Sequence, residues 1–158
     1  ARLCGKKISH LVLIDTNPFS EKKEVKQKRL ALMERVRKGE LIEVVKEQYL
    51  PRYFSLSTNR KDLETMCLDM AKSLGPEVFV RQSVALMNRP CQVETLKTIR
   101  CKTLIMCGRE DQICPLSYHY KMEELIENSE LTVLDNTGHL PTIERPKKTN
   151  FLLMEFLR

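Results

Sequence analysis

Three short apolar runs, each followed directly by turn-forming residues, constrain the fold of this chain more than any other feature. The runs cover residues 11–14, 103–107 and 131–134, followed by Asp15-Thr-Asn-Pro18, Gly108-Arg-Glu-Asp111 and Asp135-Asn-Thr-Gly-His139. Apolar runs of this length between turn residues are typical of buried strands. Helical patterns follow them, around 117–128 and from about Pro146. The sequence therefore predicts an α/β fold with about three parallel strands and right-handed crossovers.

The residues between the first two apolar runs have the pattern of helices. Apolar positions recur at helical spacing over about 21–37 and about 40–50. A third helix is expected after Asn59, with Asp62 placed almost as in a capping box. Leu and Met residues form an apolar stripe on this helix that is typical of packing in a core: Leu63, Met66, Met70 and Leu74.

This helical stretch predicts a division of the chain into two parts. Gly75-Pro76 ends the third helix and starts a fourth, which runs to about Met87. We expect residues 1–19 and 89–158 to form the α/β core, and residues 20–88 to form a helical insertion.

Composition and charge exclude several classes of function. The chain is 42% apolar, as in ordinary globular domains, and no apolar stretch is long enough to cross a membrane. The net charge is +6, but both signs are interleaved along the expected helices, so we expect neither a nucleic-acid nor a membrane partner. The six cysteines show no CxxC pair or zinc-type spacing, which favours reduced thiols, a cytoplasmic location and no metal site.

Two of the loops after the apolar runs hold residues that suit nucleophilic catalysis. Asp111 ends one loop and His139 ends another. In an open α/β sheet, reacting groups gather in the loops past the carboxyl ends of the strands, so we expect these side chains to hydrogen bond. Such a carboxylate leaves the second imidazole nitrogen available to deprotonate a nucleophile. Each residue alone is more often structural, but their joint placement favours the acid and base of a catalytic triad.

Other reactive side chains are weaker candidates. Cys114 lies in the Asp111 loop and would be a nucleophile if its thiolate paired with His139, although a packing cysteine is the stronger interpretation. His10 and His119 have no partner at a useful spacing, and we expect them at a strand edge and on a helix surface. No cofactor is expected.

Taken in order, these segments resemble the C-terminal half of the α/β-hydrolase-fold family. The matching segments are 10–16, the strand after the nucleophile helix; 81–86 and 96–99, the end of the cap and the approach to the next strand; 103–115, the acid loop; 131–141, the histidine loop; and 143–146, in the last helix. The resemblance implies that Asp111 is the triad acid, that His139 is the base, and that residues 20–88 form a helical cap over an acyl pocket.

The resemblance also implies a nucleophile that this sequence does not contain. None of its five glycines brackets a serine as the nucleophile elbow requires. The elbow and the oxyanion donors are expected upstream of Ala1, with Arg2-Leu-Cys-Gly5 as the tail of the nucleophile helix. We therefore expect the chain to be the C-terminal part of a larger enzyme and inactive alone.

The hypothesis is a cofactor-free hydrolase that acts on an ester, lactone or similar small acyl substrate. Dehalogenases, lyases and peroxidase-like members use the same positions, so the reaction class stays open. The alternative is a non-catalytic binding or structural module derived from the same fold. If the neighbouring strand is missing, the edge of strand 11–14 is unpaired, and we expect the chain to self-associate there.

Overall fold

The computed structural model describes residues 7–158, which divide into two compact units. The first unit holds the residues up to Pro18, Arg52–Thr58 and Gln92–Arg158, and the second holds Phe19–Pro51 and Asn59–Cys91. The segment Arg52–Thr58 lies inside the range expected for the helical insertion but belongs to the first unit, where its backbone and side chains find hydrogen-bond partners. The segment 2–5, expected to end the nucleophile helix, lies outside the described residues.

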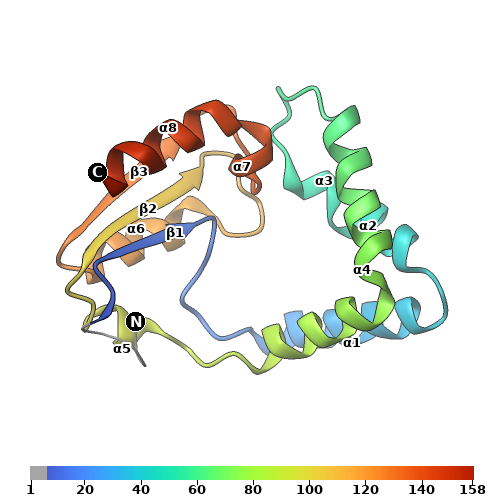
Figure 1. Ribbon diagram of the computed structural model, residues 1–158. Helices are drawn as coiled ribbons and strands as arrows, with labels where there is room; N and C mark the ends of the chain where they lie inside the picture. Colours follow the sequence, from blue (N-terminus) through green and yellow to red (C-terminus); the bar gives the residue numbers. More distant parts are fainter. Residues whose placement is uncertain (1–6) are drawn as a thin grey trace. The chain divides into compact units, whose positions relative to one another are not determined.

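The first unit is built on a parallel sheet. Its described strands, in the order β1-β2-β3, are His10–Ile14, Lys102–Gly108 and Ser129–Leu134 (Figure 1). Leu13 pairs with Ile105 of β2, which in turn pairs with Leu131 of β3. The three strands run in the same direction, so their carboxyl ends lie at one edge of the sheet. This confirms the prediction of three parallel strands.

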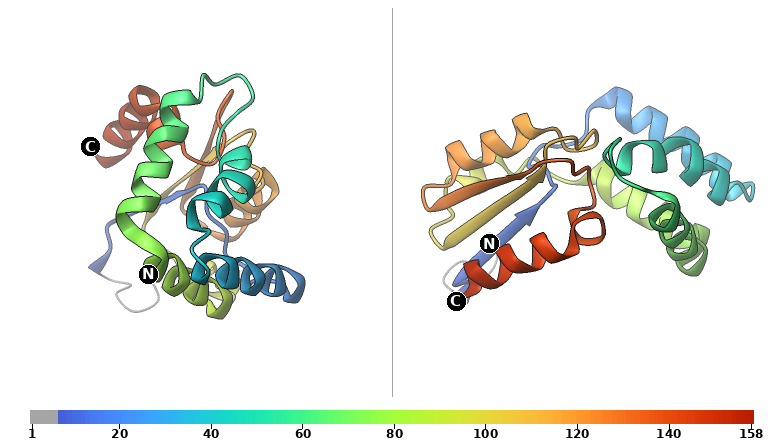
Figure 2. Two further views of the ribbon diagram at one scale, coloured as in Figure 1. Left: turned by 90° about the vertical axis from the view of Figure 1, so that its right-hand side faces the viewer. Right: turned by 90° about the horizontal axis from the view of Figure 1, so that it is seen from above.

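Helices cover both faces of this sheet. They are α5 (Val93–Leu96), α6 (Leu116–Leu125) and α8 (Pro146–Leu157). Successive strand residues point to opposite faces, so Ile105 packs with Met122 of α6 while Leu104 and Met106 pack with Phe156 of α8. Figure 2 shows α6 and α8 on opposite sides of the sheet. Both faces of β2 are therefore buried, and its apolar side chains hold the unit together.

Three short helices were not expected from the sequence. They are α3 (Leu50–Tyr53), α5 and α7 (Pro141–Glu144). Four residues are too few to show a helical period in the apolar pattern.

In residues 7–158, no helix is long and apolar enough to span a membrane.

The second unit consists of helices that contact one another. They are α1 (Lys23–Arg37), α2 (Leu41–Gln48) and α4 (Lys61–Asn88). Gly75 has φ 78° and ψ 174°, so α4 kinks there, as Gly75-Pro76 predicts. The prediction of an arrangement close to a capping box was wrong, because Arg60 takes the N-cap position and no side chain caps this helix. Because α4 starts two residues after Asn59, Asn59 lies one position before the N-cap.

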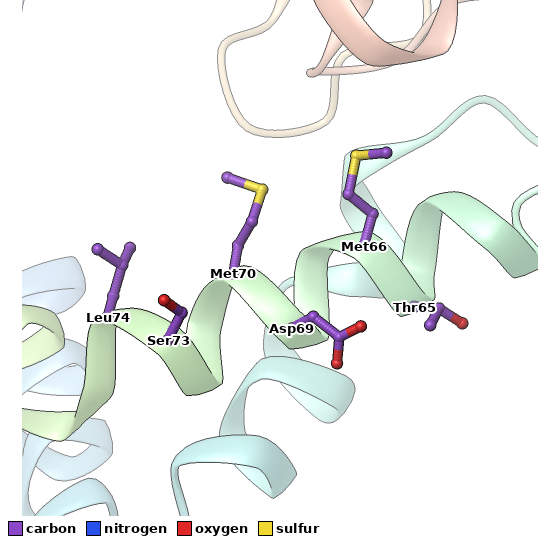
Figure 3. A pocket seen from close by; sticks show the side chains of 6 residues that line it. All are labelled: Thr65, Met66, Asp69, Met70, Ser73 and Leu74. Carbon is purple, nitrogen blue, oxygen red and sulfur yellow. The ribbon is translucent and has the colours of Figure 1, made fainter.

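The apolar stripe expected to be buried on α4 is exposed instead. Met66, Met70 and Leu74 are 46%, 55% and 53% exposed. Figure 3 shows them along one side of α4, where they line a shallow hollow with Thr65, Asp69 and Ser73. The helix buries Cys67, four residues from the half-buried Leu63. The stripe was assigned to the wrong face because both faces carry apolar residues.

Candidate active site

The carboxyl ends of β2 and β3 bring the Asp111 and His139 loops together. The Glu110 N–H donates a hydrogen bond to the Thr137 carbonyl, 2.9 Å away. A Cβ atom at Gly108 would lie only 2.0 Å from the carbonyl oxygen of Gly138. Gly108 therefore permits a contact between the loops that a larger residue would block.

Asp111 is held by hydrogen bonds on both carboxylate oxygens. Oδ1 accepts from the backbone N–H groups of Ile113 at 2.7 Å and Cys114 at 2.9 Å, and Oδ2 lies 2.8 Å from His139 Nδ1. The side chain is fully buried. Burial opposes its ionisation, but the hydrogen bonds from His139 and the backbone outweigh burial and lower the pKa of Asp111. The predicted hydrogen bond between Asp111 and His139 is confirmed.

His139 is oriented from three directions. Its backbone N–H donates to the carbonyl of Tyr53 at 2.7 Å, and the Tyr53 ring stacks on the imidazole with centroids 6.1 Å apart. With Nδ1–H donating to Asp111, the tautomer leaves a lone pair on Nε2. The His139 side chain keeps 19% of its surface exposed. This arrangement suits an imidazole that takes up a proton.

Glu144, at the end of α7, ties the His139 loop to the Arg52–Thr58 segment. One carboxylate oxygen accepts from the Gly138 N–H at 2.7 Å. The other accepts from the Ser55 N–H at 2.9 Å and from the hydroxyl of Thr58. Glu144 is 6% exposed. No pattern in the sequence marks Glu144 as functional, although it lies in the segment 143–146 that resembles the α/β-hydrolase-fold family.

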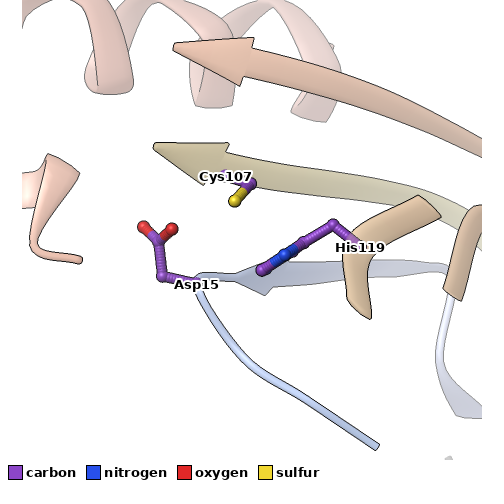
Figure 4. A group of neighbouring side chains, drawn as sticks. All are labelled: Asp15, Cys107 and His119. Atoms are coloured by element: carbon purple, nitrogen blue, oxygen red, sulfur yellow. The ribbon is translucent and has the colours of Figure 1, made fainter. Parts of the chain in front are cut away.

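A second buried group of side chains lies at the ends of β1 and β2. Figure 4 shows Asp15, Cys107 and His119 in this group. His119 is fully buried, so the expectation of a helix-surface residue was wrong. The chain folds α6 onto the sheet with the imidazole inward, where Nε2 accepts from the Thr16 N–H at 3.2 Å and Nδ1 lies 3.3 Å from the Pro115 carbonyl. Burial lowers the pKa of His119.

Two groups of potential metal ligands occur in the described residues. Asp15, Cys107 and His119 form one, and Asp111, Cys114 and His139 form the other, with ligand atoms within 4.8 Å of one another. In the first group the Nε2 lone pair of His119 already accepts the Thr16 N–H. In the second, Asp111 and His139 hydrogen bond to each other. In each group, at least one potential ligand atom is therefore already engaged in a hydrogen bond.

Cys114 is a buried residue beside the Asp111–His139 pair. It is 6% exposed, and the side-chain amide of Asn17 lies 3.6 Å from its sulfur. Its sulfur lies within 4.8 Å of ligand atoms of Asp111 and His139. A nucleophile must reach a substrate carbonyl, so burial favours the packing role. His10, by contrast, is exposed at the start of β1.

Most of the chain is similar to known proteins. The Ndr family matches residues 4–158. An esterase from Thermogutta terrifontis has a TM-score of 0.93 and 29% identity, over 100% of this chain and 58% of the esterase. Monoacylglycerol lipase ABHD6 of Mus musculus is 38% identical over 64 residues, 40% of this chain and 19% of the lipase. The 2-hydroxy-6-oxo-2,4-heptadienoate hydrolase of Pseudomonas putida is 36% identical over 64 residues, 40% of this chain and 23% of that enzyme.

The chain therefore spans only part of the length of these three proteins, which are an esterase, a lipase and a hydrolase by name. Its three strands and flanking helices superpose on the esterase over the full length of the chain. The family match extends over nearly all residues. The chain belongs to the Ndr family, and its fold is that of the C-terminal part of an α/β hydrolase.

Proposed function

We propose that this chain supplies the acid and the base of a hydrolase that cleaves ester, lactone or similar acyl substrates. The observation that carries the proposal is the 2.8 Å contact between His139 Nδ1 and Asp111 Oδ2 at the carboxyl end of the sheet. The acid is buried and the imidazole is partly exposed, which is the arrangement that a base needs to meet a substrate. The names of the esterase, the lipase and the dienoate hydrolase support the class of reaction.

In this proposal His139 acts through Nε2. It takes the proton of a nucleophilic hydroxyl as that oxygen attacks the acyl carbon, and later returns the proton to the leaving group. Asp111 fixes the tautomer and stabilises the imidazolium that forms. The Tyr53 carbonyl and ring hold the loop and the imidazole plane while the proton moves.

The nucleophile and the oxyanion donors come from outside the printed sequence. None of the five glycines brackets a serine as a nucleophile elbow requires. The buried Cys114 is poorly placed to attack a substrate. The helical unit Phe19–Pro51 and Asn59–Cys91 is proposed to be the cap that the family resemblance implies, while Arg52–Thr58 belongs to the unit that holds His139. Without a positioned nucleophile and oxyanion donors there is no charge stabilisation in the transition state. The 158-residue chain alone is thus proposed to be inactive.

The proposal is tested with the full polypeptide that the reading frame of this chain encodes. Its rate of ester hydrolysis is measured with p-nitrophenyl butyrate as substrate. We expect His139→Ala to lower kcat by about 10³-fold or more. The matched control is His10→Ala, an exposed histidine on β1, which should stay within about twofold of the unsubstituted protein. Unchanged turnover in His139→Ala contradicts the proposal.

The 158-residue chain provides a second test of the nucleophile's position. We expect it to hydrolyse the same ester no faster than the background of an exposed imidazole. Turnover that is abolished by Cys114→Ala would place the nucleophile within the chain.

The alternative function is a binding or structural module without catalysis. The family whose model matches nearly the whole chain, the Ndr family, is not named for an activity. A reading frame without a serine elbow upstream, together with no esterase activity in its product, would support the module and reject the triad.

A further inference from the structure

Asp15 occupies a constrained position where β1 ends. Its φ of 39° lies in the left-handed region, which Asp and Asn tolerate better than most residues. Its backbone N–H donates to the Met106 carbonyl at 3.0 Å, and its Oδ1 accepts from the Gly108 N–H at 2.9 Å. The residue is 7% exposed. The backbone and one carboxyl oxygen therefore fix the direction of the side chain.

The second carboxyl oxygen of Asp15 has an unusual environment. Oδ2 is buried and no hydrogen bond to it is found among the described residues. A buried ionised carboxylate with an unpaired oxygen is costly. The ionisable groups that face this carboxyl are Asp111, Cys107 and His119, and none of them is a cation at neutral pH. A carboxylic acid that donates a proton fits this site better than a carboxylate.

Asp111 offers the matching acceptor. It already accepts hydrogen bonds from Ile113, Cys114 and His139, and a carboxylate has about four lone-pair positions. One position remains for a further donor. The two residues are neighbours at Gly108, because Asp15 Oδ1 accepts from the Gly108 N–H and the Asp111 N–H donates to the Gly108 carbonyl at 3.2 Å, and the Asp111 charge raises the pKa of Asp15.

We infer that Asp15 is protonated at neutral pH and donates its Oδ2–H to the Asp111 carboxylate, which makes it a positioning residue for the Asp111–His139 pair. Burial, opposed by the Gly108 N–H and reinforced by the Asp111 charge, raises the pKa of Asp15 to about 8. The donor holds Asp111 in the rotamer that meets His139. Once Asp15 ionises, two buried anions face each other and this support is lost.

Spectroscopy of the 158-residue chain tests the protonation without any assay of activity. With ¹³C-carboxyl-labelled aspartate, we expect one carboxyl signal to titrate well above the others. It should disappear in Asp15→Asn and shift to lower pH in Asp111→Asn, where the neighbouring charge is gone. Asp135→Asn, an exposed carboxyl at the end of β3, is the matched control and should leave this signal in place. An Asp15 signal that titrates with those of exposed carboxyls overturns the inference.

The positioning role rests on the proposed hydrolase function and is tested in the active polypeptide. Asp15→Gly tolerates the left-handed backbone but removes the donor, and we expect kcat to fall about tenfold with KM nearly unchanged. Asp15→Asn retains a donor, so it should recover most of that loss and remove the fall in rate as the pH rises through 8. Equal effects of Asn and Gly, or an unchanged pH profile in Asp15→Asn, reject the positioning role.

The two proposals fail separately. If His139→Ala is inactive while Asp15→Gly is fully active, the hydrolase function stands and the role of Asp15 is wrong. If His139→Ala is fully active, the hydrolase function fails, and the carboxyl titration still decides whether Asp15 and Asp111 share a proton.

Discussion

Single buried carboxylates organise the loops around His139. Glu144 accepts hydrogen bonds from Gly138 and Ser55, residues that are far apart in the sequence. Asp111 accepts hydrogen bonds from the Cys114 N–H in its own loop and from the His139 imidazole. In both cases the donors are mostly buried backbone N–H groups, which are costly to leave unpaired. These carboxylates therefore stabilise the fold as well as the proposed site.

We expect Glu144→Ala to lower the free energy of unfolding by about 3 kcal/mol or more, because it leaves the Gly138 and Ser55 N–H groups buried without acceptors. Urea denaturation of the 158-residue chain measures this. Glu155→Ala serves as the control, since its carboxylate is 50% exposed in a surface ion pair with Arg158, and such pairs contribute about 0–1 kcal/mol. Equal losses in the two variants would show that Glu144 does not anchor the loops.

The raised pKa of Asp15 predicts a pH-dependent stability. Burial raises this pKa from 3.8 to about 8, so the folded chain binds a proton that the unfolded chain releases between these values. The stability is therefore fully present below about pH 4 and falls as the pH rises towards 8, by up to about 1.4 kcal/mol per pH unit. Asp111 has a lowered pKa, so its contribution is lost only in acid, as the pH falls below about 4.

Asp15→Asn removes the fall in stability with rising pH that the Asp15 carboxyl causes. From pH 5 to pH 8 we expect the variant to gain stability steadily relative to the unsubstituted chain, as measured by urea midpoints at each pH. Asp135→Asn, with a carboxyl that is 70% exposed, should show a constant difference. A constant difference for Asp15→Asn as well would mean that Asp15 is ionised throughout this range.

At the scale of elements, the sequence predicted what depends on local patterns. The runs at 11–14 and 103–107 became strands because apolar residues lie between turn residues. Long-range contacts could not be predicted in this way. Glu144 meets Ser55 across 89 positions, and His119 is buried because α6 packs on the sheet. Asp15 was predicted as a turn residue, which it is, but its partners come from β2 and the loop after β2, which the local pattern does not reveal.

Contacts between the loops could be predicted from the sequence only in part. The pairing of Asp111 with His139 follows from their positions after parallel strands, and the structure contains the hydrogen bond between the two side chains. The need for glycine at position 108 follows from the Gly138 carbonyl, which belongs to a different loop. Spacing along the chain contains no signal for such a contact. The catalytic roles of Asp111 and His139 remain proposals.

At the scale of the whole molecule, the outer edge of β1 predicts self-association. In the described sheet β1 pairs only with β2, so alternate N–H groups and carbonyls of residues 10–14 have no strand beside them. Leu13 itself packs against the cluster around Ile105, so association at the edge would use the backbone.

Light scattering after size exclusion measures this association. We expect the mass of the 158-residue chain to rise with concentration in the micromolar range. Amides of β1 that face away from β2 should become protected from hydrogen exchange in the concentrated sample. A monomer at every concentration, with unchanged exchange of these amides, would show that the edge is covered.

In the proposed function, Nε2 of His139 serves a nucleophile at the carboxyl end of this sheet. A crystal structure of the active polypeptide after reaction with a phosphonate ester tests it directly. We predict a phosphonylated serine from outside the printed sequence, with its oxygen about 2.6–3.2 Å from His139 Nε2 and the Asp111 hydrogen bond intact. A phosphonate on a residue that His139 does not reach, or no adduct in a polypeptide that still hydrolyses esters, would exclude this role of His139.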